Sequence, residues 1–517
     1  MKMAKSLLLG SAASMIAFGG AQAADLPVKA KAVEYVKVCS LYGAGFWYIP
    51  GTDTCIKLSG FLRMDVLAHS NSDNTGNVSG AGAAQNRFTD GYLWRSREDL
   101  SIDTRTATEY GVLRTFADMV FTWTDDAYAG NGTGATVYSP VGPSPFGSAP
   151  NNANAGAVAF GTVGVYYAFI QFAGFTMGKA ISEFSAPWTN YPGNIFDGLV
   201  GGGGAVTGVN QFTYTAQFGN GVSAAISAQD QVQYTQAGVN NVSAGGAFGT
   251  SDYANTIVPD LIGSVTVDQA WGLFKASVAA HDNHAAYYGA TELTGHPDDR
   301  WGWAGQLALS IKNIPTGPGD VINVQGVYTD GATRYNIQDL STAGAVTIYG
   351  GTSLAGAYQS VGFGIAPDTV FGAGTQQKLI QTWGGRGGYT HNWDPYWNTS
   401  IYGAWASIHY SGDAASLICG GVVDGFAFAG SFKAAAAAPG SITTCNPDYN
   451  IAQAGIITRW TPVKNLTFSA DLTYQHLDQK MAGTVSAPSA TIGKPAAVYE
   501  LRNQDNVLLL LRAQRNW

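Results

Sequence analysis

The alternation of apolar and polar residues with a period of two is the feature that most restricts how this chain can fold. In the segment Ile56–Leu67, the even-numbered residues are apolar or glycine, whereas the odd-numbered residues are mostly polar. Successive side chains of a β-strand point to opposite faces of its sheet, so this pattern predicts a strand with one apolar face. The pattern recurs in Val112–Trp123, Val222–Gln229, Gly272–His281, Trp301–Lys312 and Leu466–Gln475.

Alternation alone also fits a soluble β-sandwich, but two further features favour a barrel that spans a membrane. The first is that aromatic residues edge the apolar faces, as the two interfaces of a membrane would require. These residues are Trp94, Trp123, Trp301, Trp303, Tyr328, Tyr402, Trp405, Trp460 and Tyr474. No apolar run reaches the roughly 18 residues of a membrane-spanning helix, so a helical membrane protein is excluded.

The second feature is that short and long connections alternate along the chain. The short ones are Thr106–Tyr110, Gly219–Gly221, Ala270–Gly272, Ile314–Gly319, Asn392–Asn398 and Thr461–Asn465. The long ones, rich in Gly, Asn and Ser, are Ser70–Asp90, Asp125–Gly156, Gln231–Asn255, Tyr287–Asp299, Ala332–Thr375 and Gly412–Asp448. Outer-membrane barrels have tight turns at one end and long loops at the other, whereas a sandwich has no reason to separate them.

Sixteen segments are assigned as strands, and an even number lets the sheet close without a backbone edge that lipid cannot hydrogen-bond. Their approximate bounds are 56–67, 92–105, 111–123, 160–172, 175–183, 208–218, 222–230, 258–269, 272–282, 301–312, 321–329, 378–391, 400–410, 450–460, 465–475 and 506–517. Sixteen strands leave an aqueous lumen, whereas eight would be filled by side chains. We therefore predict an all-β, 16-stranded antiparallel transmembrane β-barrel over residues 56–517. Its last strand ends on Trp517, and Arg515 on the lipid side of that strand must lie at the membrane interface.

Residues 1–23 contain the three parts of a secretory signal peptide in the right order. Lys2 and Lys5 make the start positive, Leu7–Phe18 is a short apolar core, and Ala21–Ala23 is an A-x-A cleavage site. Loss of the two lysines takes the formal net charge from -8 to -10. Such an acidic chain, with Lys and Arg scattered along it, is not expected to bind nucleic acid, which needs a basic face.

The four cysteines fall into two local pairs, Cys39 with Cys55 and Cys419 with Cys445. An even number of cysteines in an exported chain favours disulfides. Three connectivities are possible, and the local one closes the shortest loops. The competing interpretation, a metal site, lacks C-x-x-C spacing and a suitably placed His. The first bridge would lie in an N-terminal, periplasmic-side segment at residues 24–55.

Several stretches of the sequence resemble one known family. They are Val33–Cys39, Tyr42–Phe46, Tyr48–Cys55, Thr108–Thr115 and Arg512–Trp517. Together they resemble the trimeric general porins of alpha-proteobacteria, and the resemblance covers the first 120 residues and the last strand. It implies a sixteen-stranded barrel, a homotrimer, and a third external loop folded into the pore as a constriction.

In that family an acidic loop faces a basic barrel wall, and the resemblance places the loop here at Ser182–Thr207. The carboxylates of this segment are Glu183 and Asp197. The basic wall is expected from inward positions of the first three strands: Arg63, Arg95, Arg97 and Arg114. Opposite charges across a narrow pore create a transverse field that orients dipolar solutes. The alternative is that these arginines only pair with neighbouring carboxylates, namely Asp99, Asp103 and Asp118. Glu98 falls on the apolar face and is an unexplained exception.

The expected function is passive diffusion of ions and small hydrophilic solutes across the outer membrane of a Gram-negative bacterium. The alternatives are a substrate-selective channel and a barrel adhesin. An enzyme is not expected, because neither G-x-S-x-G nor H-E-x-x-H occurs, and Gly201–Gly204 lacks the Gly-Lys-Ser/Thr that completes a phosphate loop. No metal or cofactor is expected; His281 and His284 are too isolated to form a metal site. The expected partners are other copies of the chain, outer-membrane lipids and lipopolysaccharide.

Overall fold

The computed structural model describes residues 37–70, 85–86, 91–124, 162–203, 207–231, 237–337, 346–435, 441–486 and 494–517. The predicted signal peptide at residues 1–23 and the predicted long connection at 125–156 lie outside the described residues. The domain boundaries therefore stay predictions.

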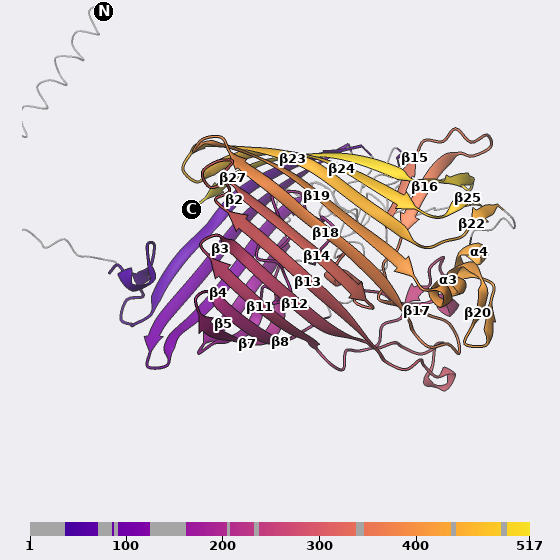
Figure 1. The fold of residues 1–517 in the computed structure, drawn as a ribbon, viewed down its shortest axis with the longest axis horizontal. Helices are drawn as coiled ribbons and strands as arrows, with labels where there is room; N and C mark the ends of the chain where they lie inside the picture. The colour runs from indigo at the N-terminus through magenta and orange to yellow at the C-terminus, as the bar shows by residue number, and fades with distance from the viewer. Residues whose placement is uncertain are drawn as a thin grey trace, which may run out of the picture.

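Sixteen antiparallel strands in the described part of the chain form a closed barrel, and β27 pairs with β2 to complete it. The strands are tilted relative to the long axis of the barrel (Figure 1). They are β2 Cys55–His69, β3 Tyr92–Thr108, β4 Gly111–Thr124, β5 Thr162–Phe172, β6 Phe175–Ala180, β7 Val209–Gly219, β8 Val222–Gln229, β11 Asp260–Gln269, β12 Gly272–Asn283, β13 Arg300–Lys312, β14 Val321–Asp330, β18 Lys378–Asn392, β19 Trp397–Tyr410, β23 Tyr449–Val463, β24 Leu466–Gln479 and β27 Gln504–Asn516. The predicted fold class is confirmed, and each predicted strand overlaps one of these.

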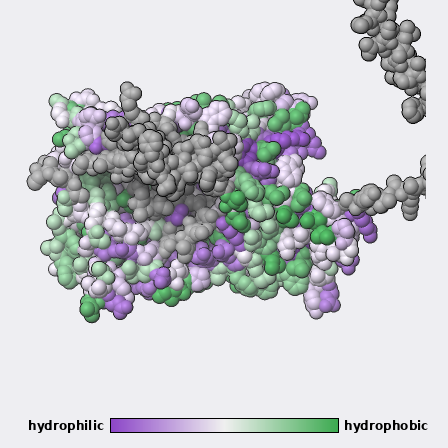
Figure 2. Space-filling model, turned by 180° about the vertical axis from the view of Figure 1, so that it is seen from behind, coloured by the Kyte–Doolittle hydropathy of each residue, from purple (hydrophilic) through white to green (hydrophobic). Residues whose placement is uncertain are grey.

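The period of two places apolar side chains outside the barrel and polar ones inside. On β2, Leu62 is 54% exposed on the outer wall, whereas Asp65 faces inward and is 1% exposed. Figure 2 shows hydrophobic side chains gathered over the part of the outer wall nearer the turns. Of the predicted edge aromatics, those exposed on the outer wall are Trp94, Trp301, Trp303, Trp405, Trp460 and Tyr474. Tyr402, by contrast, is 6% exposed and faces inward, where its hydroxyl donates a hydrogen bond to Asp471. Near the turns the indoles of Trp397 and Trp460 stack with 5.7 Å between ring centroids.

The connections between barrel strands at one end of the barrel, the turn end, are all short. The turn between β7 and β8 is Asn220–Gly221, and both residues have positive φ, 48° and 73°. A two-residue turn of this kind needs positive φ at both central positions, which Asn and Gly tolerate best. A Cβ on Gly221 would also lie 1.8 Å from the Asp268 carbonyl oxygen, so glycine is required there.

The long connections at the opposite end carry structure of their own (Figure 1). Their elements are β9 Val239–Asn241, β10 Thr250–Ser251, β15 Val346–Gly350, β16 Gln359–Gly364, β17 Thr369–Phe371, α3 Gly412–Cys419, β20 Gly421–Val423, β21 Phe426–Phe428, α4 Ser431–Ala435, β22 Ile442–Thr444, β25 Ala482–Ser486 and β26 Val498–Leu501. β15, β16, β26, β25 and β22 form a five-stranded sheet, and β20 pairs with β21. Among the described residues, no helix is long and apolar enough to cross a membrane.

These loops pack on an apolar patch inside the barrel mouth. Leu67 of β2, Leu93 of β3 and Leu508 of β27 face inward and are almost fully buried, in one hydrophobic cluster with loop residues that include Phe196 and Ile337. The lumen-facing side of the wall is therefore polar along most of its length but apolar where the loops cover it.

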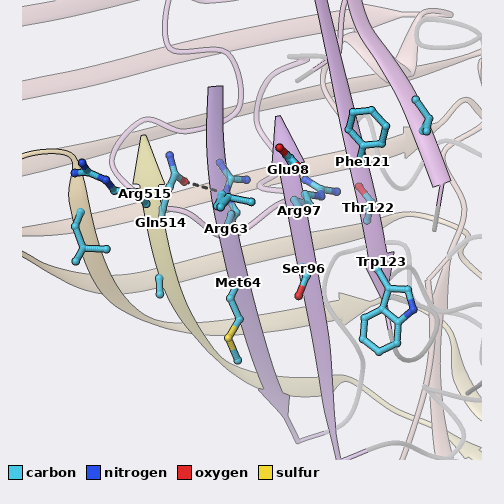
Figure 3. A pocket seen from close by; sticks show the side chains of 14 residues that line it. Arg63, Met64, Ser96, Arg97, Glu98, Phe121, Thr122, Trp123, Gln514 and Arg515 are labelled. Carbon is cyan, nitrogen blue, oxygen red and sulfur yellow. Dashed lines mark hydrogen bonds between the residues drawn. The ribbon is translucent and has the colours of Figure 1, made fainter. Parts of the chain in front are cut away.

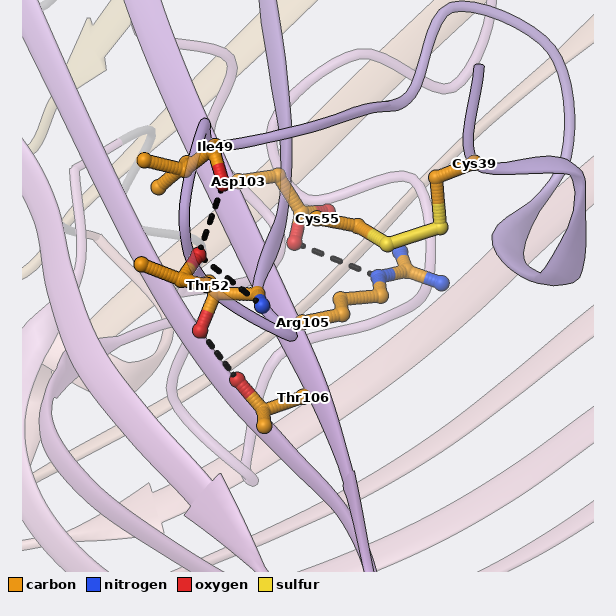
Figure 4. The surroundings of a disulfide bond; sticks show 8 residues. Cys39, Ile49, Thr52, Cys55, Asp103, Arg105 and Thr106 are labelled. Carbon is orange, nitrogen blue, oxygen red and sulfur yellow. Dashed lines mark hydrogen bonds and ion pairs between the residues drawn. A yellow bond between two sulfur atoms is a disulfide. The ribbon is translucent and has the colours of Figure 1, made fainter. Parts of the chain in front are cut away.

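Both predicted disulfides are present. Cys39 joins Cys55 at the start of β2, and Cys419 at the end of α3 joins Cys445. Cys39 and Cys55 are buried against Phe46, and the Arg105 guanidinium lies 4.9 Å from the centre of the Phe46 ring. Figure 4 shows Arg105 beside the first bridge, with a hydrogen bond to Asp103. The bridge thus fixes the chain before β2 to the turn end of the barrel.

Candidate constriction site

The loop between β6 and β7 leaves the wall after Ala180 and crosses the lumen. The Trp188 indole donates a hydrogen bond to Gln325 of β14 at 2.8 Å, and the Gln306 amide of β13 donates to the Phe184 carbonyl at 2.7 Å. β13 and β14 lie five and six strands from β6 around the closed sheet. The described part of this loop, residues 181–203, therefore lies inside the barrel and contacts distant strands of the wall. Its role as a constriction stays a prediction.

Arg386 of β18 holds the middle of the loop. Its guanidinium donates to Asn190 Oδ1 at 2.5 Å, to the Thr189 carbonyl at 2.6 Å and to the Leu199 carbonyl at 3.1 Å. The side chain is 3% exposed. A guanidinium can make several such contacts because it presents five donors in one rigid plane.

Two further wall residues bind the backbone of the loop. The Asp471 carboxylate of β24 accepts hydrogen bonds from the amides of Ile195 and Phe196, at 2.8 and 3.2 Å. Arg459 of β23 donates to the Gly193 carbonyl at 2.6 Å. The wall is thus bonded to the main chain of the loop, and these bonds fix the path of the loop independently of the side chains that point away from the wall.

Asp197 turns from the loop toward the wall formed by β27, β2 and β3. Arg95 lies 3.3 Å from the Asp197 carboxylate and 2.6 Å from that of Asp65, and Arg512 lies 2.6 Å from Asp65 on its other side. Arg95 and Asp65 are each 1% exposed. Acidic and basic groups therefore alternate along a row that links the partly exposed Asp197 of the loop to buried residues of three strands.

Asp197 stays ionised in this position. Burial by itself raises the pKa of a carboxyl, but the nearby charges of Arg95 and Arg97 outweigh it and hold the pKa of Asp197 well below its usual range. The Tyr191 hydroxyl donates a hydrogen bond to the same carboxylate. Burial, together with the charge of Asp197, raises the pKa of Tyr191 well above its usual value, so the hydroxyl keeps its proton.

The other predicted acidic residue, Glu183, lies on the far side of the lumen. Its carboxylate is 3.7 Å from Lys275 of β12 and accepts a hydrogen bond from Ser264 of β11 at 3.3 Å. Each of the two loop carboxylates therefore has a basic partner.

The four predicted arginines are placed differently from one another. Arg95 meets the loop at Asp197, as described. Arg114 lies 3.0 Å from Asp103 and also donates to Gln171, so in the described part of the chain its hydrogen-bond partners are all on the barrel wall. Arg63 of β2 and Arg97 of β3 are direct neighbours in the register, and Arg63 donates to Gln514 of β27 at 2.9 Å (Figure 3).

Sequence reasoning missed several residues that hold the site together. Arg512 and Asp65 have the inward parity of their strands, so parity alone could have marked them. Arg386 stands in the glycine-rich stretch Gly384–Gly388, and its charge amid glycines was the available signal. Asp471 lies on the polar face of its strand among uncharged Ser and Thr, and only the structure shows that a loop binds there.

The outer wall carries a shallow hollow of about 780 Å³ over β27, β2, β3 and β4. Most of its side chains have the outward parity, including Leu62, Met64, Trp123 and Arg515. Glu98 also lines it, as the sequence pattern implied (Figure 3). Within the described residues, no group of three or more His, Cys, Asp or Glu side chains is arranged to hold a metal ion.

Comparison with known proteins agrees with this architecture. The chain is 36% identical to porin Omp2b of Brucella suis biovar 1 over 283 residues, which cover 54% of this chain and 66% of that one. It is also 36% identical, over 287 residues, to porin Omp2b of Brucella melitensis biotype 1, with the same coverage. The matched region thus spans just under two thirds of the length of these curated relatives.

Among solved structures, the outer-membrane channel DcaP of Acinetobacter baumannii is similar in fold, with a TM-score of 0.54 and 15% identity over 91% of this chain and 99% of that one. A model of the porin subfamily matches residues 25–510, nearly the whole sequence. The predicted family and the predicted location are confirmed: the chain is an outer-membrane β-barrel that belongs to the porin family.

Proposed function

We propose that this protein is a passive diffusion channel for ions and small hydrophilic solutes across the outer membrane. The observation that carries the proposal is the pairing of a sixteen-stranded barrel with a loop bonded across its lumen. A barrel of this size is wide enough for water to pass, and the loop sets the width of the passage. Membership of the porin family favours a channel over an adhesin or an enzyme.

We also propose that solutes are sorted at this constriction by charge. The side chains that would act are Glu183 and Asp197 on the loop and Arg63, Arg95, Arg97 and Arg114 on the wall. Because Asp197 pairs with Arg95, and Glu183 with Lys275, the loop contributes little net charge of its own. Selectivity would then depend mainly on the wall residues that have no carboxylate beside them.

Single-channel recording in a planar lipid bilayer tests the channel itself. The purified mature protein is expected to give large, steady openings whose conductance rises roughly in proportion to the KCl concentration. Correctly folded protein that stays silent would contradict the proposal and point to a sealed barrel. Folding is checked separately, by the shift in gel mobility that a barrel shows after boiling in detergent.

One observation favours a second candidate, a channel selective for sugars. Three aromatic rings, Phe116 of β4 and Tyr167 and Phe169 of β5, cluster at inward positions, and the Phe116 and Phe169 ring centres are 5.4 Å apart. Sugar rings stack on aromatic faces. Block of the KCl current by sucrose or maltotriose at millimolar concentration, lost in Phe169→Ala, would favour this candidate, and no block would leave the general channel.

We propose a homotrimer whose contacts include the hollow around Glu98. A carboxylate facing lipid is unfavourable, whereas contact with another protomer would remove it from lipid. The remaining outer wall would face membrane lipids and lipopolysaccharide. The mass of the detergent-solubilised protein, measured by light scattering, is expected to correspond to three chains. A single-chain mass for a conducting preparation would refute the trimer without affecting the channel proposal.

A further inference from the structure

One lumen-facing row of side chains crosses five neighbouring strands and contains no carboxylate. The backbone register places its members directly beside one another, from β24 through β27, β2 and β3 to β4. They are Thr467, Gln514, Arg63, Arg97 and Thr122. We call this set the arginine row. Every member can donate hydrogen bonds, and two of the five are permanently positive.

The neighbouring row, two residues further along each strand, is built differently. There Asp65 stands between Arg512 and Arg95, each at 2.6 Å, and Asp197 approaches Arg95 from the loop. The charges of that row are therefore balanced within the protein. By contrast, Arg63 and Arg97 have no carboxylate within 4.0 Å among the described residues, so Asp65 and Asp197 act on them only from beyond ion-pair distance.

Most guanidinium N–H groups of Arg63 and Arg97 have no partner in the part of the chain that the structure describes. Among the described residues, Arg63 has a hydrogen bond to Gln514 and a contact with the Phe61 ring, whose centre is 4.2 Å from the guanidinium carbon. The buried Nε of Arg97 has no hydrogen-bond partner in the described part of the chain. Two like charges directly opposite each other on paired strands repel. An anion between them would remove that repulsion and accept several N–H groups at once.

We propose that the arginine row is a binding site for an oxyanion, the carboxylate or phosphate group of a small solute on its way through the channel. A planar guanidinium fork matches the geometry of both groups. The site deepens the proposed channel function and rests on it. The nearest loop carboxylate, Asp197, contacts Arg95 and Tyr191 and acts on Arg97 only from beyond ion-pair distance, so it does not sit between Arg63 and Arg97. An anion would thus be held briefly beside the constriction.

The test is the block of single-channel KCl current by added sodium phosphate or, separately, sodium acetate. In the wild-type channel the current is expected to fall with a saturating dependence on the added anion. In Arg63→Gln and in Arg97→Gln, the half-blocking concentration should rise roughly tenfold, because a hydrogen bond to a charged group is lost. Block by phosphate but not acetate would assign a phosphate site, and the reverse a carboxylate site.

Arg105→Gln is the matched control, since Arg105 lies on the same face of β3 but pairs with Asp103 at 2.9 Å. This variant should be blocked as the wild-type channel is. Equal block in the wild type, Arg63→Gln and Arg97→Gln, or a complete lack of block in the wild type, would overturn the site. Because the KCl conductance is measured in the same recordings, an open channel without block refutes only the anion site, whereas a silent protein refutes the channel.

Discussion

The carboxylate of Asp471 is the contact through which a change in the barrel wall should most clearly release the constriction loop. It accepts the Ile195 and Phe196 amides on one oxygen and the Tyr402 hydroxyl, at 2.5 Å, on the other. In Asp471→Leu, both loop amides lose their acceptor. A buried donor left without a partner costs about 1–3 kcal/mol, so the two together cost about 2–6 kcal/mol.

That loss should raise the population of displaced loop conformations at least roughly thirtyfold. We expect open-channel noise and extra conductance levels in single-channel recordings of Asp471→Leu. Asp471→Asn is the control, because its remaining oxygen can still accept the two amides and its NH2 group can donate to Tyr402. The reasoning is refuted if folded Asp471→Leu gives currents as steady as those of the wild type, since the contact would then not hold the loop.

Three further predictions concern other parts of the molecule. Asp197→Asn frees Arg95 from its loop partner, so the reversal potential in a KCl gradient should shift toward anion selectivity; an unchanged potential would exclude Asp197 from the ion path. Removal of the Cys419–Cys445 bridge by paired Ala substitutions should destabilise the external loops by about 3 kcal/mol, measured as faster amide exchange in α3 with the barrel strands unchanged. Lys494 lies just before β26 and packs on the Tyr349 ring of β15, 4.4 Å from its centre. Burial lowers the pKa of Lys494 to about 8, so between about pH 8 and about pH 10.4 the unfolded loop binds a proton that the folded loop does not. Protection of β26 from amide exchange should therefore increase as pH rises through this range. Lys494→Met should abolish that dependence.

The barrel could be predicted from the sequence because its rules are local. A strand that faces lipid on one side and water on the other must alternate, and every predicted strand overlaps an observed one. The short turns follow equally local rules, as Asn220–Gly221 illustrates. The local cysteine pairs were predictable because each closes a short loop.

Predictions were weakest where segments distant in sequence meet. The inward leucines of the barrel mouth, such as Leu508, break the polar pattern because external loops cover them. Nothing near Leu508 in the sequence indicates that cover. Arg386 and the loop residue Asn190 are likewise far apart in the chain, and their contact exists only once the barrel has closed.

The charges at the constriction show the same limit: the sequence predicts on which face of the sheet a residue lies, but not which residues lie beside it. Parity identifies which arginines point into the lumen, and it found Arg63, Arg95 and Arg97 together. Which of them are neutralised depends on register, because only the pairing of β2 with β3 sets Asp65 beside Arg95 and Arg63 beside Arg97. The local alternation determines the face but not the register, which depends on the whole closed sheet. A list of inward arginines is therefore obtainable from sequence, whereas the free positive charge that a passing solute meets is a property of the assembled barrel.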